Sequence, residues 1–257
     1  MTSKISHQIV EAQNSPLPPG FLTDLPRLFR EGGVSLYKKR NEIKRFDING
    51  QTVCVKRYGI PPLFNRVLYS LGWRMPKAKR TYENAQEILN RGFSTPRQYG
   101  YVLEYKNGWL GDCFSVGEYI EDIHSLEDSH QDEALLRAFA TYTAQLHEHG
   151  MMHRDYILNN ILYRREGEEY KFTLIDINRF VFRDKPIRGF LQRLNLMQPF
   201  NRQTELKKFV QAYTAAAHAP LGLCKQVACM RRWRTRYSEL KRLLKKIPGA
   251  KRIANYR

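Results

Sequence analysis

The chain has 257 residues, with 43 Lys+Arg against 25 Asp+Glu and a formal net charge of +18. This length is enough for one large domain or two small lobes, and a hydrophobic content of 42% with 12% aromatics excludes a disordered chain. No apolar stretch is long enough to cross a bilayer, residues 1–20 lack the apolar core of a secretory signal, and four cysteines do not make a disulfide framework in a chain this long. We therefore expect a folded protein of a reduced, cytosolic compartment.

The first half of the chain predicts a sheet with two helices. Residues 1–20 predict a loose arm, and Phe21–Arg30 predicts a short helix because its leucines fall on one side. A three-stranded meander follows, then a helix that Gly92 ends, then two more strands around a turn. The predicted strands are Val34–Tyr37, Glu42–Phe46, Thr52–Tyr58, Arg97–Tyr105 and Leu110–Tyr119, and the predicted helix is Lys77–Arg91.

The second half predicts mainly helices. Glu133–Gly150 is typical of an amphipathic helix, Asn160–Tyr163 and Lys171–Ile175 predict two strands of a hairpin, and the chain from Lys185 onward is mainly helical and basic. The order of the elements predicts an α+β protein, with a small β-rich lobe before a larger α-rich lobe. We expect an N-terminal arm and short helix over 1–30, an N-lobe over 31–119 and a C-lobe over 120–257.

The positive charge is concentrated in two segments. Val181–Arg257 holds 19 Lys+Arg and 3 Asp+Glu, and Arg57–Arg80 holds six basic residues and no acidic one. Tyr101–Asp176 holds 15 acidic and 6 basic residues. This asymmetry favours a surface for a polyanion, such as phosphate-rich lipid, acidic saccharide or nucleic acid, and the alternative is a solvated face that only keeps the protein soluble.

Six polar residues occur in an order that resembles the protein-kinase-like fold. A lysine lies inside an apolar strand, a glutamate lies on the next helix, His-Arg-Asp is followed by Asn after four more residues, and an aspartate ends a later strand. These residues are Lys56, Glu83, His153, Asp155, Asn160 and Asp176. A lysine in a strand is often only an edge residue. Glu87 lies on the same helix face as Glu83 and is an alternative partner for Lys56. The pattern from His153 to Asp176 is more specific to kinase-like folds.

Each residue type suits phosphoryl transfer from ATP, which needs positive charge near the phosphates and an oriented hydroxyl. Lys56 would contact the α/β-phosphates, and Glu83 would hold its ammonium group. Asp176 and Asn160 offer oxygen ligands to Mg²⁺. Asp155 would orient or accept the proton of the attacking hydroxyl, and His153 would brace the loop.

The sequence also departs from ordinary protein kinases. It has no G-x-G-x-x-G loop, so Lys39 and Asn41 in the first strand turn are candidates to cover the phosphates, unless this turn is a plain exposed hairpin. Asp176 is followed by Ile-Asn-Arg, no A-P-E occurs downstream, and residue 157 is Ile where Ser/Thr kinases usually carry Lys.

The chain resembles the bacterial lipopolysaccharide kinase family, the Kdo/heptose kinases with a protein-kinase-like two-lobed fold. The similar segments are KRNEIKRF, VCVKRYG, KAKRTYENAQEIL, GFSTPRQYGY, HRDYILNNILY, LIDINRF and FLQRLNLMQ. The resemblance implies transfer from ATP, with Mg²⁺, to a sugar hydroxyl (Kdo or heptose) of the lipopolysaccharide inner core or its lipid-linked precursor, by a cytoplasmic protein peripheral to the inner membrane.

The basic surface independently suits an anionic lipid-linked saccharide on an anionic membrane surface. Arg154 and Arg179 are the candidates to contact this acceptor, although Arg154 could instead brace its loop. No specific nucleic acid is expected, because no base-reading motif is present. Two other hypotheses stay open at this point: an atypical protein Ser/Thr kinase, and a non-catalytic kinase-like binding module.

Overall fold

We describe a computed structural model of the chain over residues 4–129 and 132–244. Two compact units divide it: the first comprises residues 1–124 and 162–180, and the second comprises 125–161 and 181–257, each to the extent described. The end of the predicted basic C-terminal segment, residues 245–257, lies outside the described residues.

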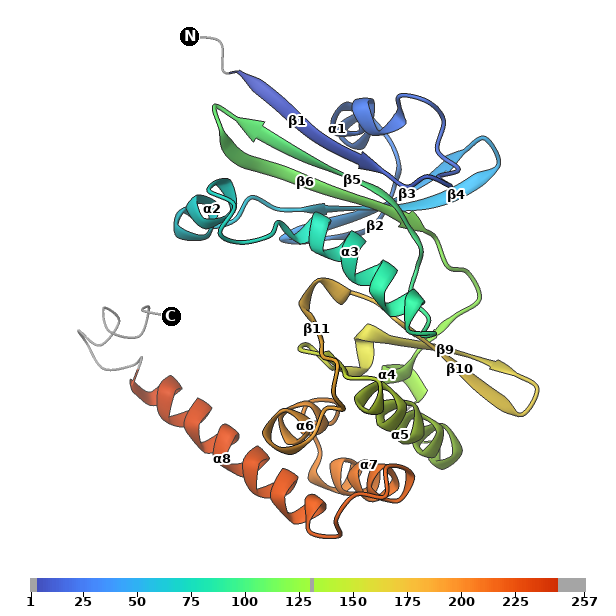
Figure 1. The fold of residues 1–257 in the computed structure, drawn as a ribbon, viewed down its shortest axis with the longest axis vertical. Helices are drawn as coiled ribbons and strands as arrows, with labels where there is room; N and C mark the ends of the chain where they lie inside the picture. The colour runs from blue at the N-terminus through green and yellow to red at the C-terminus, as the bar shows by residue number, and fades with distance from the viewer. Residues whose placement is uncertain (1–3, 130–131, 245–257) are drawn as a thin grey trace. The chain divides into compact units, whose positions relative to one another are not determined.

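A six-stranded sheet, in which each strand pairs antiparallel with its neighbours, dominates the first unit (Figure 1). Its strand order is β1-β5-β6-β4-β3-β2. The strands are β1 (Ile5–Glu11), β2 (Val34–Lys38), β3 (Asn41–Ile48), β4 (Gln51–Tyr58), β5 (Gln98–Lys106) and β6 (Trp109–Glu118). The five strands β2 to β6 confirm the five that the sequence predicts.

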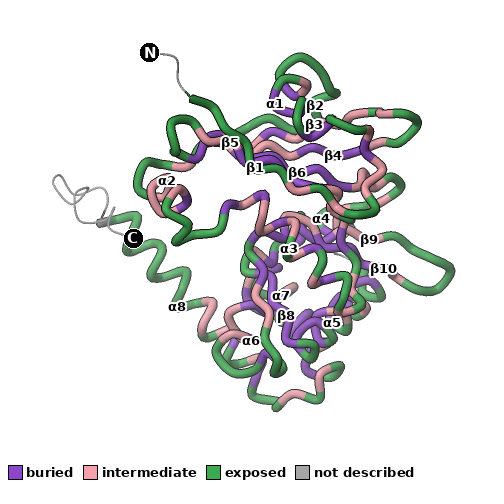
Figure 2. The backbone as a smooth tube through the Cα atoms, turned by 45° about the horizontal axis from the view of Figure 1, so that its top comes forward, coloured by how far each residue is buried: buried purple, intermediate pink, exposed green. Residues whose placement is uncertain are grey.

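Each face of this sheet is covered by helices (Figure 1). Because successive strand residues point to opposite faces, Val53 and Val55 pack under α1 (Phe21–Glu31), whereas Tyr58 belongs to the cluster that includes α2 (Leu63–Ser70) and α3 (Lys77–Asn90). The central strands are largely buried, as the tube in Figure 2 shows. The two faces therefore have different neighbours, and Lys56 lies on the face of α3.

Two elements of this unit differ from the sequence predictions. The expectation of a loose arm is wrong for residues 5–11, which form β1 and pair with β5 in a continuous register. Six of these seven residues are exposed, so their pattern lacks the buried alternation that marks a strand. Helix α2 was also not predicted, because prolines precede it and it has only eight residues.

A second strand pair leads to the end of the first unit. β9 (Ile161–Glu166) and β10 (Glu169–Leu174) form the predicted hairpin and belong to a three-stranded sheet in the order β10-β9-β7, where β7 is His124–Ser125. After β10 the chain makes the short 3₁₀ turn η2 (Ile177–Arg179) and enters β11 (Phe180–Phe182), which pairs with β8 (Met151–His153). Asp176 lies between β10 and η2.

The second unit is mainly helical, as predicted. Its helices are α4 (Leu126–Ser129), α5 (Glu133–Glu148), η1 (Leu158–Asn160), α6 (Gly189–Leu196), α7 (Gln203–Ala216) and α8 (Leu223–Leu244). Phe139 of α5 and Phe209 of α7 stack with ring centroids 5.0 Å apart in the core of this unit. Gly150 ends α5 at a φ of 68°, where a Cβ would meet the Arg183 carbonyl oxygen at 2.1 Å, so only glycine fits.

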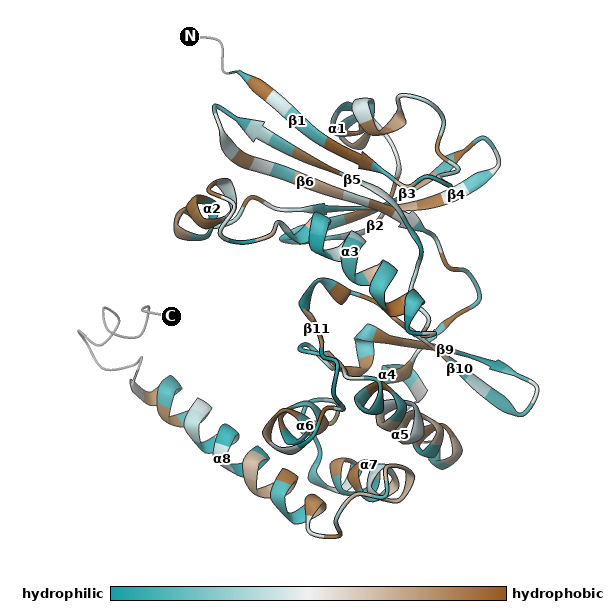
Figure 3. Cartoon of the chain, in the orientation of Figure 1, coloured by the Kyte–Doolittle hydropathy of each residue, from teal (hydrophilic) through white to brown (hydrophobic). Residues whose placement is uncertain are grey.

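The mixture of a large antiparallel sheet with separate helices confirms the predicted α+β class. Among the described helices, none has the length and apolar composition that a membrane span requires. Hydropathy along the chain shows why: polar segments interrupt even the longest helix, α8 (Figure 3).

Candidate active site

Lys56 occupies a half-buried position on a central strand. β4 pairs with β3 on one side and β6 on the other, with Lys56 opposite Ile43 and Ser115. Only 17% of its side chain is exposed, and its ammonium group lies 5.3 Å from the centre of the Tyr58 ring. Because both neighbouring strands fix the backbone, the ammonium group has a defined position on the face of α3.

Asp176 is held by contacts on both sides of it in the chain. Before it, the Leu174 N–H donates to the Ser94 carbonyl at 2.9 Å and Thr95 Oγ1 donates to the Leu174 carbonyl at 2.8 Å. After it, Asn84 Nδ2 on α3 donates to the Ile177 carbonyl at 2.7 Å. The FSTP turn and α3 therefore position the loop that carries Asp176.

The backbone of Asp176 itself is unusual. Its φ of 52° and ψ of 41° lie in the left-handed region, which non-glycine residues seldom adopt. Such conformations occur where the surrounding structure imposes them, often at functional sites. Here the turn directs the carboxylate toward β4.

Lys56 and Asp176 meet, although 120 positions separate them in the sequence. Lys56 Nζ donates to Asp176 Oδ1 at 2.8 Å, and Asn178 Nδ2 donates to the same oxygen at 2.5 Å. Burial by itself lowers the pKa of Lys56, but Tyr58, Asp176 and Cys54 outweigh it, and the net pKa is raised above 10.5. The Asp176 carboxylate, which also accepts the Lys56 hydrogen bond, is one of the groups that favour the charged form of the lysine.

Lys77 is a further cation that interacts with Asp176, and the sequence analysis missed it. Lys77, in the first turn of α3, has its pKa lowered first by burial and then by Arg40, with smaller contributions from other cations. Those others are Arg179 and Lys56, while Asp176 opposes them. Repulsion between cations is relieved by a polyanion, so this cluster is suited to a polyphosphate.

The expected partner of Lys56 on α3 is not in contact with it. Glu83 lies 3.7 Å from Lys79, and Glu87 lies 2.7 Å from Arg91, each in an i,i+4 ion pair. Within the described part of the chain, neither glutamate forms an ion pair with Lys56. The assignment of Glu83, and the choice between Glu83 and Glu87, therefore stay predictions.

The other residues predicted to bind nucleotide lie in the turn between β2 and β3. Lys39 is exposed, and its backbone N–H donates to the Asn41 carbonyl at 3.0 Å. Asn41 Oδ1 is buried and has no hydrogen-bond partner among the described residues. Arg179, the predicted acceptor contact in this unit, is exposed on η2.

The loop that contains His153, Asp155 and Asn160 lies in the second unit and is internally bonded. The Asp155 N–H donates to His153 Nδ1 at 3.0 Å, and Asn160 Nδ2 donates to the Asp155 carbonyl at 2.9 Å. His153 is fully buried, Asp155 is partly exposed and Arg154 is exposed. The imidazole thus accepts from the loop backbone, and the bracing role of His153 in a catalytic loop stays a prediction.

A buried chain of hydrogen bonds supports this loop, and no sequence motif indicates it. Asn195 Nδ2 donates to the His153 carbonyl at 2.7 Å, and His147 Nε2 lies 2.9 Å from Asn195 Oδ1. His147 Nδ1 lies 2.8 Å from the Tyr213 hydroxyl, to which Gln192 donates at 2.9 Å. Since Asn195 Oδ1 can only accept, Nε2 carries the His147 proton and Nδ1 accepts from Tyr213.

The same chain of bonds requires a neutral His147. Burial lowers its pKa from 6.5 to about 4, although its hydrogen bond to Asn195 opposes this effect. A protonated ring would donate from both nitrogens, so Tyr213 would lose the hydrogen bond that it donates to Nδ1 and would have to accept from both His147 and Gln192. The network therefore has one consistent arrangement at neutral pH.

The donor atoms of the two predicted metal ligands, Asp176 and Asn160, are of the kind that a magnesium ion binds. Asp176 supplies a carboxylate and Asn160 an amide oxygen, and Mg²⁺ needs few protein ligands because it keeps water and phosphate oxygens. Among the described residues, no group of three or more His, Cys, Asp or Glu side chains could hold a metal by itself. That Asp176 and Asn160 together hold the ion stays a prediction from the sequence.

The comparisons with known proteins decide the family. The profile of the lipopolysaccharide kinase (Kdo/WaaP) family matches residues 44–217. The chain belongs to this family. A solved structure of WaaP in complex with acyl carrier protein has the same fold, with a TM-score of 0.59, 16% identity, and coverage of 90% of this chain and 98% of that chain. No curated protein matches the sequence.

These findings confirm three predictions. The family resemblance is confirmed, the WaaP match confirms the kinase-like fold, and the chain is a phosphotransferase of the kinase class with a role in lipopolysaccharide biosynthesis. The matched segment includes Lys56, Lys77, Asp155 and Asp176.

Proposed function

We propose that the protein is an ATP- and Mg²⁺-dependent kinase that phosphorylates a Kdo or heptose hydroxyl of the lipopolysaccharide inner core or of its lipid-linked precursor. The observation that carries this proposal is the 2.8 Å contact between Lys56 and Asp176 in a member of the lipopolysaccharide kinase family. A lysine and a metal-binding aspartate held together are the two parts that every kinase-like site needs for a nucleotide phosphate chain.

In this proposal the first unit holds the nucleotide. Lys56 contacts the α/β-phosphates, Lys77 neutralises further phosphate charge, and Lys39 and Asn41 cover the phosphates from their turn. Asp176 of this unit, together with Asn160 of the second unit, would hold Mg²⁺. The ion supplies charge neutralisation across the phosphates when bound. Glu83 keeps its predicted role of orienting Lys56, which would require it to leave Lys79.

The loop of the second unit acts on the acceptor. Asp155 orients the sugar hydroxyl and accepts its proton, as a positioned carboxylate does in phosphoryl transfer. His153 holds the Asp155 backbone through the 3.0 Å hydrogen bond. Arg154 and Arg179 are exposed and contact the anionic saccharide, because guanidinium groups pair well with carboxylate and phosphate.

The acceptor and the charge of the chain together suggest where the protein works. A lipid-linked saccharide is reached at a membrane surface, and a net charge of +18 favours an anionic leaflet. We propose a cytoplasmic protein that is peripheral on the cytoplasmic face of the inner membrane.

The test is transfer of label from γ-labelled ATP. The protein is incubated with Mg²⁺ and Kdo-lipid A, with a heptose-containing core in a second arm and a generic protein substrate in a third. Acyl carrier protein is added in a separate arm, because WaaP is solved in complex with it. We expect label in a lipid-linked sugar, and transfer at least about a hundredfold slower when Asp155 is replaced by Asn.

Label in the protein substrate alone would overturn the proposal in favour of an atypical protein kinase. ATP binding without transfer to any acceptor would favour a binding module. Mass spectrometry of lipid A–core from cells with and without the chain identifies the acceptor, since the loss of one phosphate from a particular sugar names both its class and its position.

A further inference from the structure

The second half of α8 is exposed on all sides and carries an apolar stripe. From Arg232 to Leu243 every residue is exposed (Figure 2). Trp233, Tyr237 and Leu240 follow each other at intervals of four and three, which places them on one face of a helix. They are 68%, 49% and 54% exposed, and the Trp233 and Tyr237 rings stack at 5.6 Å with an 8° angle between them.

Basic residues flank this stripe on both sides. At 100° per residue, Arg232 and Arg236 lie on one side of the stripe, and Arg234 and Lys241 lie on the other. Glu239 is the single acidic residue between Arg231 and Leu243 in the sequence. Hydrophobic and hydrophilic bands alternate along α8 in Figure 3.

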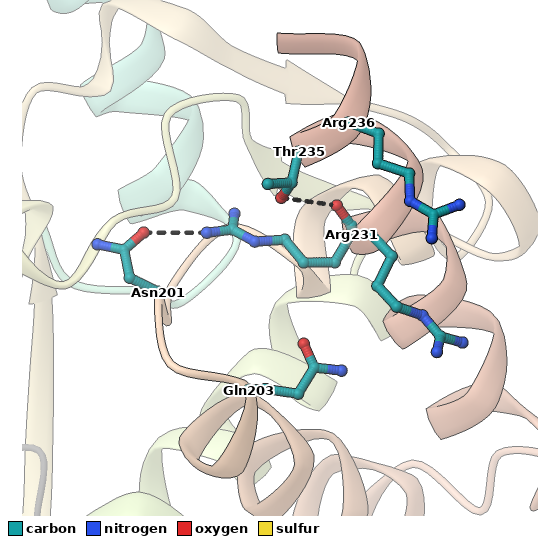
Figure 4. Close-up of a pocket in the computed structure, with 6 residues that line it drawn as sticks. Asn201, Gln203, Arg231, Thr235 and Arg236 are labelled. Carbon is teal, nitrogen blue, oxygen red and sulfur yellow. Dashed lines mark hydrogen bonds between the residues drawn. The ribbon is translucent and has the colours of Figure 1, made fainter. Parts of the chain in front are cut away.

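The opposite face of α8 fixes the helix to its own unit. Leu223 and Val227 are buried, and Arg231 donates to the Met197 carbonyl at 3.1 Å and to Asn201 Oδ1 at 3.0 Å. Figure 4 shows Arg231 reaching Asn201 while Arg236 points away from it. Because this contact lies on the far side from the stripe, it holds α8 without covering Trp233 or Tyr237.

A groove beside the stripe extends the apolar surface. It has a volume of about 880 Å³ and lies between α6 and α8. Phe190, Leu194 and Met230 line it together with Trp233, and Arg234 lies at the same groove. Phe190 is 61% exposed. Apolar side chains next to guanidinium groups therefore form one continuous surface on the second unit.

We propose that this α8 surface docks on an anionic lipid bilayer, with Trp233, Tyr237 and Leu240 in the headgroup–acyl boundary and the flanking arginines on lipid phosphates. Aromatic side chains favour this depth of a membrane, and basic residues beside an apolar face are typical of helices that lie in it. The inference rests on the proposed function only for preferring a bilayer to another polyanion. An acidic polypeptide satisfies the charges but leaves the stripe in water.

The test is binding of the full chain to vesicles, which needs no turnover. Vesicles of phosphatidylethanolamine with about one third phosphatidylglycerol are compared with vesicles of phosphatidylcholine alone. We expect tight binding to the anionic vesicles, weakened by high salt. The double variant W233S/L240S and the double variant R232Q/R234Q should each weaken it about tenfold or more.

Matched controls identify the surface. The variant F64S/W73S changes two exposed aromatic residues of the first unit, at α2 and the loop after it, and should bind vesicles like the unaltered chain. Circular dichroism checks that the variants are folded. Equal binding of the unaltered chain and W233S/L240S would overturn the inference, as would a loss seen only in F64S/W73S.

Polyglutamate tests whether charge alone explains binding. It should bind far more weakly than the anionic vesicles, and equal binding would overturn the inference because charge alone would then explain it.

Two further outcomes separate this inference from the proposed function. If α8-dependent vesicle binding is observed while ATP phosphorylates no lipid-linked sugar, the docking inference stands and the proposed function fails. If transfer to detergent-dispersed acceptor occurs without vesicle binding, the reverse holds.

Discussion

At the scale of single residues, the two candidate carboxylates, Asp176 and Asp155, have different surroundings. Asp176 accepts from Lys56 and from Asn178 on one oxygen, while Lys77, Arg40 and Arg179 add positive charge to the same region. Asp155 is different, because its backbone is fixed by His153 and its side chain is partly exposed. The first set suits a bound polyphosphate, and the second suits a carboxylate that meets an acceptor.

Asp155→Asn should abolish most turnover. The amide keeps the size of the side chain but cannot accept a proton, so we expect kcat to fall by roughly 10²- to 10⁴-fold. Single-turnover assays with lipid-linked acceptor measure the effect, and thermal unfolding checks that the fold is intact. A variant with full activity would remove Asp155 from the site.

Lys77→Met should act mainly on nucleotide binding. Loss of a charge-assisted contact to phosphate should raise the KM for ATP about tenfold, with a smaller change in kcat. Lys79→Met is the matched control, because Lys79 lies on the same helix but pairs with Glu83. Equal effects of the two substitutions would show that Lys77 has no special contact with the nucleotide.

At the scale of elements, Asp176 depends on α3 and on the FSTP turn. The turn bonds to Leu174, and Asn84 of α3 bonds to Ile177. These contacts lie on either side of the left-handed residue. They assign a structural purpose to the GFSTP segment, whose role the sequence did not indicate.

Asn84→Ala should loosen the loop that carries Asp176, the predicted Mg²⁺ ligand. The Ile177 carbonyl loses its donor, which costs about 1 kcal/mol of folding free energy, and the concentration of Mg²⁺ for half-maximal activity should rise several-fold. Titration of activity with Mg²⁺ measures this, with the exposed Gln86→Ala on the same helix as the control. The account of α3 is contradicted if both variants need the same Mg²⁺ concentration.

At the scale of the whole molecule, stability should depend on pH through His147. The folded pKa is lowered from 6.5 to about 4, so the unfolded chain binds the extra proton first. Above pH 6.5 His147 is neutral in both states and does not lower the free energy of unfolding. As the pH falls from 6.5 toward 4, the free energy of unfolding decreases by about 2 kcal/mol by pH 5 and by about 3 kcal/mol in all.

Urea unfolding at neutral pH and at pH 5 measures this dependence. His147→Gln should be less stable at neutral pH but should lose less stability on acidification, because glutamine does not titrate. The difference between the two pH slopes isolates His147 from the carboxylates. Identical slopes would mean that the buried imidazole is not the titrating group.

Much of the fold followed from local patterns, and the departures have physical causes. Alternation predicted β4 and hence the position of Lys56 inside it, and Gly150 correctly marked the end of α5. β1 escaped prediction because it is an exposed edge strand whose paired residues in β5 lie 89 to 101 positions away. Its hydrogen bonds, and not a buried face, define it.

Some residues of the candidate site could likewise be predicted from the sequence, and others could not. The order of Lys56, Asp155, Asn160 and Asp176 was visible in the sequence because each lies in a recognisable segment. Lys77 and the His147–Asn195 network were not visible, since a lysine at a helix start and a histidine on an apolar face have many ordinary roles. Only tertiary contacts show that Lys77 and the His147–Asn195 network belong to the site. Because Glu83 pairs with Lys79 in the structure, its role beside Lys56 stays a prediction.

The most direct measurement is calorimetric binding of ATP with and without Mg²⁺. The central claim is that Lys56 and Asp176 together hold a magnesium nucleotide. We predict that the unaltered chain binds ATP more tightly with Mg²⁺, that Asp176→Asn removes this difference, and that Lys56→Met weakens binding about tenfold while Lys79→Met does not. Unchanged affinity and unchanged magnesium dependence in both site variants would contradict the account.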